Sequence, residues 1–143
     1  ALCAALFSRG LQIYHWTFIL PTSTEDATKF HAVIGAESWL YLRDEHFLSK
    51  SRHACVVVQL AAPDTCTADE LDNILKDVPL QTPEGEDEIF TCRVWLRAAA
   101  GMLHEHGIIN CPNPKELEEE LKELAHANNQ DSLEGRGYVF HKS

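Results

Sequence analysis

The first third of the chain alternates apolar and polar residues in the two-residue period that is typical of β-strands. Residues 11–20 are rich in β-branched and aromatic side chains, and residues 28–34 repeat the pattern before a glycine, so we predict a strand in each. Alternate strand residues point to opposite faces of a sheet, so His15 should face away from Trp16. If the two strands form an antiparallel hairpin, one register places His15 and His31 on the same surface.

Three further strands are predicted from the same kind of pattern. One covers residues 39–43. Another covers residues 53–61, where Val56, Val57 and Val58 make the strand apolar on both faces, as expected of a central strand. Residues 137–141 are expected to add an edge strand at the end of the chain.

The pattern changes to the helical period between residues 67 and 125. Thr67 and Glu70 form a capping box that opens a helix reaching to about residue 78. A second helix begins after Thr91 and ends at Gly107, and a third is capped by Asn113. The third helix has a narrow leucine stripe, and its charge run predicts a solvated face. The order β-β-β-β-α-α-α-β predicts one α+β domain, residues 1–143, with a mostly antiparallel sheet and segregated helices.

Composition limits the classes of partner. The 143 residues carry 45% hydrophobic and 24% charged residues, as in a globular domain, and a net charge of −10 that argues against nucleic acid. The five cysteines lack the Cys-x-x-Cys spacing, which favours a reducing, cytoplasmic location. Residues 1–7 are apolar without a basic leader region, and the start at Ala1 leaves secretion open. No apolar run approaches about 20 residues, so no stable membrane insertion is expected. The sequence does not indicate an oligomeric state.

Cys92 is the candidate for covalent chemistry. With Thr91 as the N-cap, its thiol lies in the first helical turn, where the helix dipole stabilises a thiolate. The alternative is an inert, packed cysteine, because Cys92 shares an apolar helix face with Leu96, Ala99 and Leu103.

Three short motifs carry a resemblance to a known group. They are Tyr-His-Trp around His15, Phe-His-Ala around His31, and Thr-Cys-Arg-Val-Trp beginning at Thr91. In this order they resemble the permuted papain-like fold of the lecithin:retinol acyltransferase group of NlpC-type thiol hydrolases. Over nearly its whole length the chain also resembles an uncharacterised set of fungal proteins with Tyr-His-Trp, His and Cys-x-x-Trp motifs.

The resemblance implies a cysteine-dependent hydrolase or acyltransferase. Cys92 is then the nucleophile, His15 the base and His31 the orienting third member, with no cofactor and no metal. The partner is a small-molecule or peptide acyl substrate, attacked at an amide, ester or thioester. The chain departs from the group at Thr91, where asparagine is usual, and its last residues, 138–143, are not expected to form the C-terminal membrane helix of the phospholipase members.

Two other interpretations remain from the residues. A catalytically silent binding or accessory module would keep the fold and pack Cys92 in its core. A metal site at His104 and His106, or at His53 and Cys55, is the other. It is disfavoured at His104 and His106, because residues two apart on a helix lie on different faces.

Overall fold

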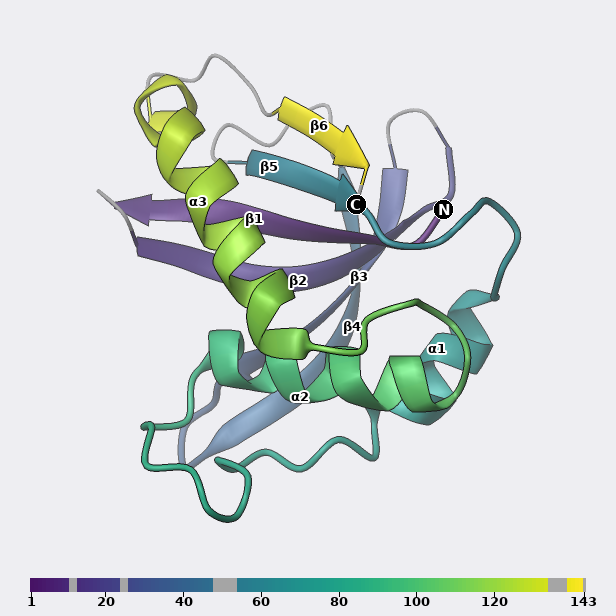
Figure 1. Cartoon of the computed structure of the whole chain (residues 1–143), viewed down its shortest axis with the longest axis vertical. Helices are drawn as coiled ribbons and strands as arrows, with labels where there is room; N and C mark the ends of the chain where they lie inside the picture. Colours follow the sequence, from purple (N-terminus) through teal and green to yellow (C-terminus); the bar gives the residue numbers. More distant parts are fainter. Residues whose placement is uncertain (11–12, 24–25, 48–53, 134–138, 143) are drawn as a thin grey trace.

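A six-stranded sheet with three helices forms the domain (Figure 1). The computed structural model describes residues 1–10, 13–23, 26–47, 54–133 and 139–142. The strands are β1 (Cys3–Gly10), β2 (Ile13–Pro21), β3 (Asp26–Ile34), β4 (Trp39–Phe47), β5 (Ala54–Gln59) and β6 (Val139–Lys142). The helices are α1 (Ala68–Leu75), α2 (Cys92–Glu105) and α3 (Pro114–Leu133). The strand order is β4-β3-β2-β1-β5-β6, with only β6 parallel to its neighbour. The predicted α+β class and mostly antiparallel sheet are confirmed.

Strand β1 is absent from the sequence prediction, which treats residues 1–7 only as an apolar start. It lies between β2 and β5 and is hydrogen-bonded to both. Leu2, Ala4 and Leu6 are buried toward the helices, while Ala5 and Phe7 join a smaller apolar cluster on the other face. A strand covered on both faces is apolar throughout, so it lacks the alternation by which exposed strands are identified.

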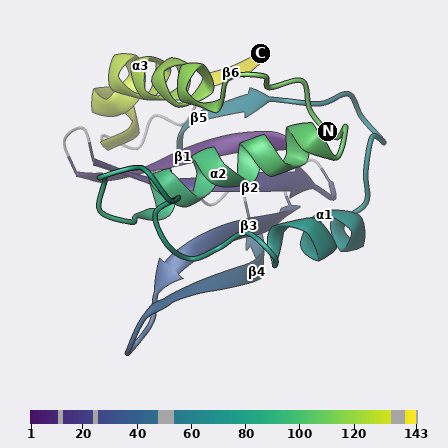
Figure 2. The ribbon, with the colours of Figure 1, turned by 60° about the horizontal axis from the view of Figure 1, so that its bottom comes forward.

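All three helices pack on one face of the sheet (Figure 2). Helix α3 contacts β5 and β1, α2 contacts β2 and β3, and α1 contacts β3. One predicted helix end was wrong, because α1 ends at Leu75 rather than near residue 78. Helix α3, whose start was predicted without an end, continues through the polar residues 128–133. None of the helices in the described ranges is long and apolar enough to span a bilayer.

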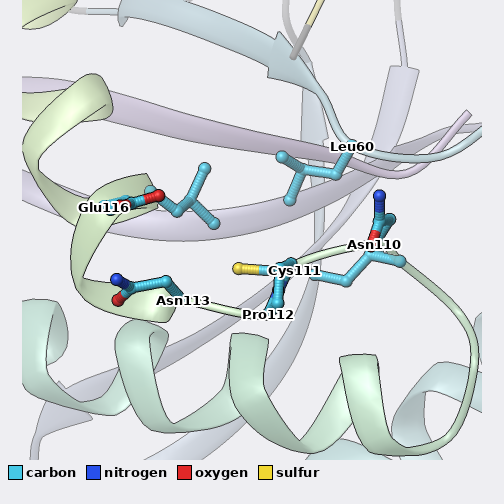
Figure 3. Close-up of a pocket in the computed structure, with 8 residues that line it drawn as sticks. Leu60, Asn110, Cys111, Pro112, Asn113 and Glu116 are labelled. Carbon is cyan, nitrogen blue, oxygen red and sulfur yellow. The ribbon is translucent and has the colours of Figure 1, made fainter.

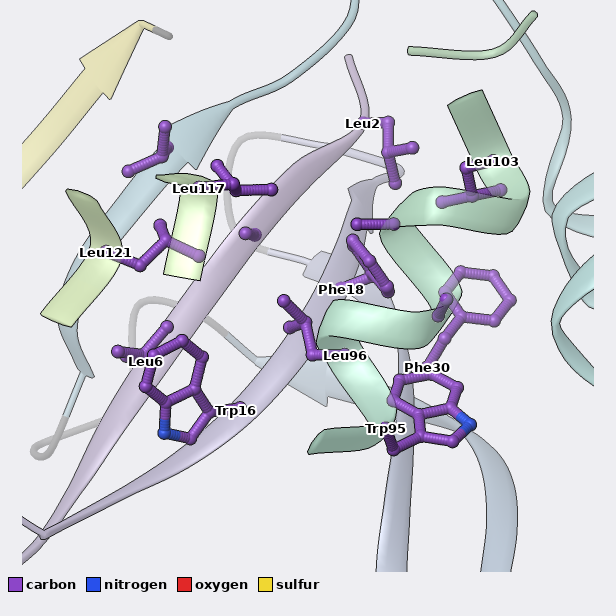
Figure 4. Packing of buried hydrophobic residues seen from close by; sticks show 14 of the residues in the cluster. Leu2, Leu6, Trp16, Phe18, Phe30, Trp95, Leu96, Leu103, Leu117 and Leu121 are labelled. Carbon is purple, nitrogen blue, oxygen red and sulfur yellow. The ribbon is translucent and has the colours of Figure 1, made fainter. Parts of the chain in front are cut away.

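The main core lies between the helices and the sheet (Figure 4). Phe18, Phe30 and Trp95 are fully buried. The rings of Trp95 and Phe18 meet edge-on, with their centres 5.9 Å apart. Leu96 and Leu103 reach this core from α2. Each such side chain contributes about 1.5–3 kcal/mol by leaving water, so α2 is fixed firmly against β2 and β3.

Strands β2 and β3 separate partway along their length. They pair only from Phe18 opposite Phe30 to Pro21 opposite Ala27. Beyond this point β2 remains paired with β1, and β3 remains paired with β4. The N-terminal end of α2 lies over the place where the two strands part, because Cys92 shares a cavity with residues of both.

A buried ion network joins α2 to α3 and to the loop before α2. Arg97 is only 6% exposed, and its guanidinium contacts Glu86, Glu88 and Glu118 at 2.8–2.9 Å. Arg93 contacts Glu118 at 3.1 Å. The prediction that the charges of α3 form a solvated face was therefore wrong for Glu118, which is 6% exposed. A carboxylate can be buried here because two guanidinium groups share it.

Candidate active site

Cys92 begins α2, as the capping pattern predicts. Thr91 has extended backbone angles and its side chain accepts a hydrogen bond from the Val94 N–H. The Cys92 side chain is half-buried, and its sulfur lies 3.9 Å from the Tyr14 carbonyl oxygen, to which the thiol donates a long, weak hydrogen bond. The helix cap thus presents the thiol toward β2 rather than toward open solvent.

His15, His31 and Asp44 form a hydrogen-bonded chain. His15 Nε2 lies 2.6 Å from His31 Nδ1, and His31 Nε2 lies 2.7 Å from Asp44 Oδ2. The two imidazole rings meet edge-on with their centres 4.9 Å apart. The contact spans the separated part of β2 and β3, so the side chains join the strands where the backbone ladder has stopped.

The positions of the protons on His15 and His31 follow from the Asp44 carboxylate, which accepts the last of these hydrogen bonds. An ionised carboxylate only accepts, so His31 Nε2 carries a proton and donates to Asp44. In a neutral His31 ring the other nitrogen, Nδ1, must then accept. His15 Nε2 consequently donates to His31, which leaves His15 Nδ1 with a free lone pair. This nitrogen is the one that can act as a base.

Burial is the main influence on the ionisation of this site. It lowers the pKa of His15 to about 3, with nearby positive charges acting in the same direction, and it also lowers the pKa of His31. Burial raises the pKa of the Cys92 thiol, although backbone N–H groups, first that of Trp16, oppose the rise. Both rings are therefore neutral and the thiol is protonated at pH 7. The expectation of a thiolate stabilised by the helix N-terminus was wrong, because burial outweighs the backbone donors.

Cys92 lines two cavities. A cavity of about 300 Å³ is lined by Cys92, His15 and His31 together with Arg9 and the apolar Ala32, Val33, Ile34 and Trp39. A second cavity of about 260 Å³ is lined by Cys92 together with Ile13, Tyr14, Trp16, Thr91, Arg93 and Lys122. Cys92 lines both cavities, so an extended molecule could place one part in each.

The structure brings the three predicted site residues to one cavity. His15 and Trp16 lie on opposite faces of β2, as predicted, and His31 shares the His15 face. Across the described ranges, the hydrogen-bond acceptor of the Cys92 thiol is Tyr14 rather than either imidazole. Trp39 is half-buried and also lines this cavity.

Sequence reasoning missed Asp44. It lies on β4 directly opposite Lys29 of β3, two positions from the residue that faces His31. The available signal was the alternation of β4, which puts Asp44 on the sheet face that carries His31 once register is known. Without the register, one acidic residue among 22 offers nothing to select it.

Cys111 lines a separate cavity of about 140 Å³ (Figure 3). Figure 3 shows its sulfur directed toward Asn113 and Glu116. Burial raises the pKa of this thiol too, and none of the described residues that line the cavity is histidine. The imidazole of His104 lies beside Cys111, but it accepts from the Cys111 backbone N–H through Nδ1 and does not line this cavity, so it is not placed as a base for the thiol.

The residues considered for a metal site make backbone contacts. His104 Nδ1 accepts from the Cys111 N–H at 3.0 Å, and His106 Nδ1 lies 2.9 Å from the Met102 carbonyl. His53 lies outside the described residues. Within the described ranges, no three histidine, cysteine or carboxylate side chains converge on one point.

Neither models of known protein families, nor curated proteins, nor solved structures give a match to this chain.

Proposed function

We propose that this protein is a cysteine-dependent hydrolase or acyltransferase with a permuted papain-like arrangement of its site. Cys92 is the nucleophile, His15 the base and His31 the residue that orients the base. Asp44 extends this set by fixing the tautomer of His31. The observation that carries the proposal is the hydrogen-bonded chain from His15 through His31 to Asp44, because His15 and His31 line the cavity that Cys92 also lines.

The reaction begins from a neutral thiol and a neutral imidazole. The Cys92 side chain turns from the Tyr14 carbonyl toward His15 Nδ1, which takes the proton as the sulfur attacks the substrate carbonyl carbon. The carbonyl π electrons move to the oxygen. The backbone N–H groups around the sulfur, those of Trp16, Cys92 and Arg93, are the donors available to this oxyanion. The neighbouring His31 and Asp44 stabilise the imidazolium that forms at His15.

Collapse of the tetrahedral adduct completes the transfer. The carbon–leaving-group bond breaks, the leaving group takes the proton from His15, and the acyl group remains on Cys92 as a thioester. Water or another nucleophile then gives a proton to His15 and attacks the thioester carbonyl. The carbon–sulfur bond breaks, and the proton on His15 returns to the Cys92 sulfur.

A second candidate is a binding module of the same fold with a silent cysteine. It is favoured by the raised pKa of the Cys92 thiol and by its contact with the Tyr14 carbonyl. The two functions differ in whether His15 accelerates a reaction at Cys92. A buried thiol without base assistance reacts slowly whatever stands at position 15.

The test is acylation by 4-nitrophenyl acetate, with nitrophenolate release and mass spectrometry to locate the acetyl group. We expect acetylation of Cys92, slowed roughly 100-fold or more in His15→Gln, which is the usual scale of general-base assistance. Cys66→Ser is the matched control, because Cys66 is also half-buried with a pKa raised by burial but lies outside this cavity. Equal labelling of Cys66 and Cys92, or a His15→Gln variant that reacts like the wild type, would favour the binding module.

A further inference from the structure

Arg9 is the cation of the Cys92 cavity. It lies at the irregularity of β1 between Ser8 and Gly10, next to Ser8, whose register partner Tyr14 precedes His15 on β2. Arg9 is exposed and lines the same cavity as His15 and Cys92. Its charge lowers the pKa of both imidazoles and of the Cys92 thiol, as expected of a guanidinium held close to all three.

Arg9 differs from the other arginines whose positions are known. Arg43 pairs with Asp69 at 2.9 Å, and Arg93 and Arg97 pair with glutamates in the buried network. No carboxylate in the described part of the chain pairs with Arg9 at 4.0 Å or less. As far as the described residues go, the guanidinium of Arg9 therefore has no carboxylate to compete with an anionic ligand.

Two other charged side chains, Lys29 and Asp44, help to set the local charge near Arg9. Lys29 lies on the same face, with its ammonium 5.5 Å from the centre of the Phe7 ring. Burial lowers the pKa of Lys29; the charge of Asp44 opposes this decrease, and the charge of Arg9 adds to it. Asp44 lies opposite Lys29 and already accepts from His31. The local charge is therefore positive on the Arg9 side, although the whole chain is acidic.

We infer that the Cys92 cavity takes acyl substrates that carry a carboxylate or phosphate group, and that Arg9 binds this group. The inference rests on the proposed function, since it assigns the substrate class of the same site. The wall formed by Val33, Ile34 and Trp39 receives the apolar part of the substrate, and the carbonyl lies at Cys92. Arg9 suits an oxyanion because its planar fork of donors matches two oxygens at once.

The test compares two chromogenic esters that differ by one anionic group, 4-nitrophenyl acetate and 3-carboxy-4-nitrophenyl acetate. After correction for their uncatalysed hydrolysis, we expect the wild type to prefer the carboxylated ester in kcat/KM by on the order of 10- to 100-fold. Arg9→Gln should bring this ratio close to one, and Arg9→Glu should invert it. The ratio is the readout because a change in the reactivity of Cys92 affects both esters alike. Inorganic phosphate and acetate, added as competitors, show which oxyanion the site prefers.

Lys122→Gln is the matched control, because Lys122 lines the second of the two cavities that Cys92 lines. It should keep the wild-type ratio. A wild-type ratio near one, or a ratio that falls in Lys122→Gln but not in Arg9→Gln, would overturn the inference.

A binding measurement separates this outcome from failure of the proposed function. Binding of 2-nitrobenzoate to Cys92→Ser, followed through the imidazole resonances of His15 and His31, requires no turnover. Saturable binding that is lost in Arg9→Gln supports the anion site, even if neither ester acylates Cys92 in the wild type. Acylation of the wild type by both esters without such binding overturns the anion site and leaves the proposed function standing.

Discussion

Replacing Arg97 by methionine tests whether the ion network beneath the site is a real determinant of stability. The substitution keeps most of the aliphatic volume and removes a charge that is 6% exposed. Removing one partner of a buried ion pair costs about 3–5 kcal/mol, because the other charge stays buried. Here Arg93 still contacts Glu118 at 3.1 Å, so we expect about 2–3 kcal/mol. With a urea slope of about 1–3 kcal/mol/M, the unfolding midpoint should fall by about 0.7–3 M.

Urea unfolding at pH 7, followed by tryptophan fluorescence, measures this loss. Lys122→Met is the control, since Lys122 and Glu119 form a solvent-exposed pair at 3.4 Å whose loss should cost less than about 1 kcal/mol. In the double variant Arg97→Met with Glu118→Leu, the stranded carboxylate is gone, so the loss should be smaller than the sum of the two single losses. A cost below about 1 kcal/mol for Arg97→Met, or strict additivity in the double variant, would refute the reasoning.

Three further expectations concern the site. Asp44→Asn removes the charged acceptor at the end of the imidazole chain, so acylation of Cys92 by 4-nitrophenyl acetate should slow by about 10- to 100-fold; an unchanged rate would contradict the role of Asp44. The pKa of His15 is about 3 in the folded state and about 6.5 in the unfolded state. The contribution of His15 to the free energy of unfolding is therefore complete above pH 6.5 and is lost as the pH falls toward 3. Between pH 7 and pH 4 the wild type should therefore lose about 2 kcal/mol more in urea unfolding than His15→Gln, after allowance for partial exposure; parallel curves would show that His15 titrates normally. Thr91→Ala should cost about 1 kcal/mol of unfolding free energy and should also slow the acylation of Cys92. Thr67→Ala removes the cap of α1 and should cost as much free energy without slowing the acylation. Equal effects of the two variants on the acylation rate would argue that the α2 cap does not position the thiol.

The sequence by itself determined the features that depend on neighbouring residues. Thr67 and Thr91 cap their helices as expected, because a cap needs only a side-chain oxygen and a free N–H within the same turn. The alternation of β2 correctly separated His15 from Trp16 for the same local reason. The assignment of Cys92 to the first turn of a helix followed from the cap as well.

The tertiary structure decided what depends on residues far apart in the chain. The bond between His15 and His31 depends on where β2 and β3 part, and the bond between His31 and Asp44 depends on the register of β3 with β4. Glu118 is buried only because α3 packs beside the arginines of α2. The ionisation of Cys92 was mispredicted for the same reason: the helix N-terminus is visible in the sequence, but the surrounding chain that removes water from the sulfur is not. Local hydrogen bonds and periodicity can be read along the chain, whereas desolvation and strand register exist only after the chain has folded.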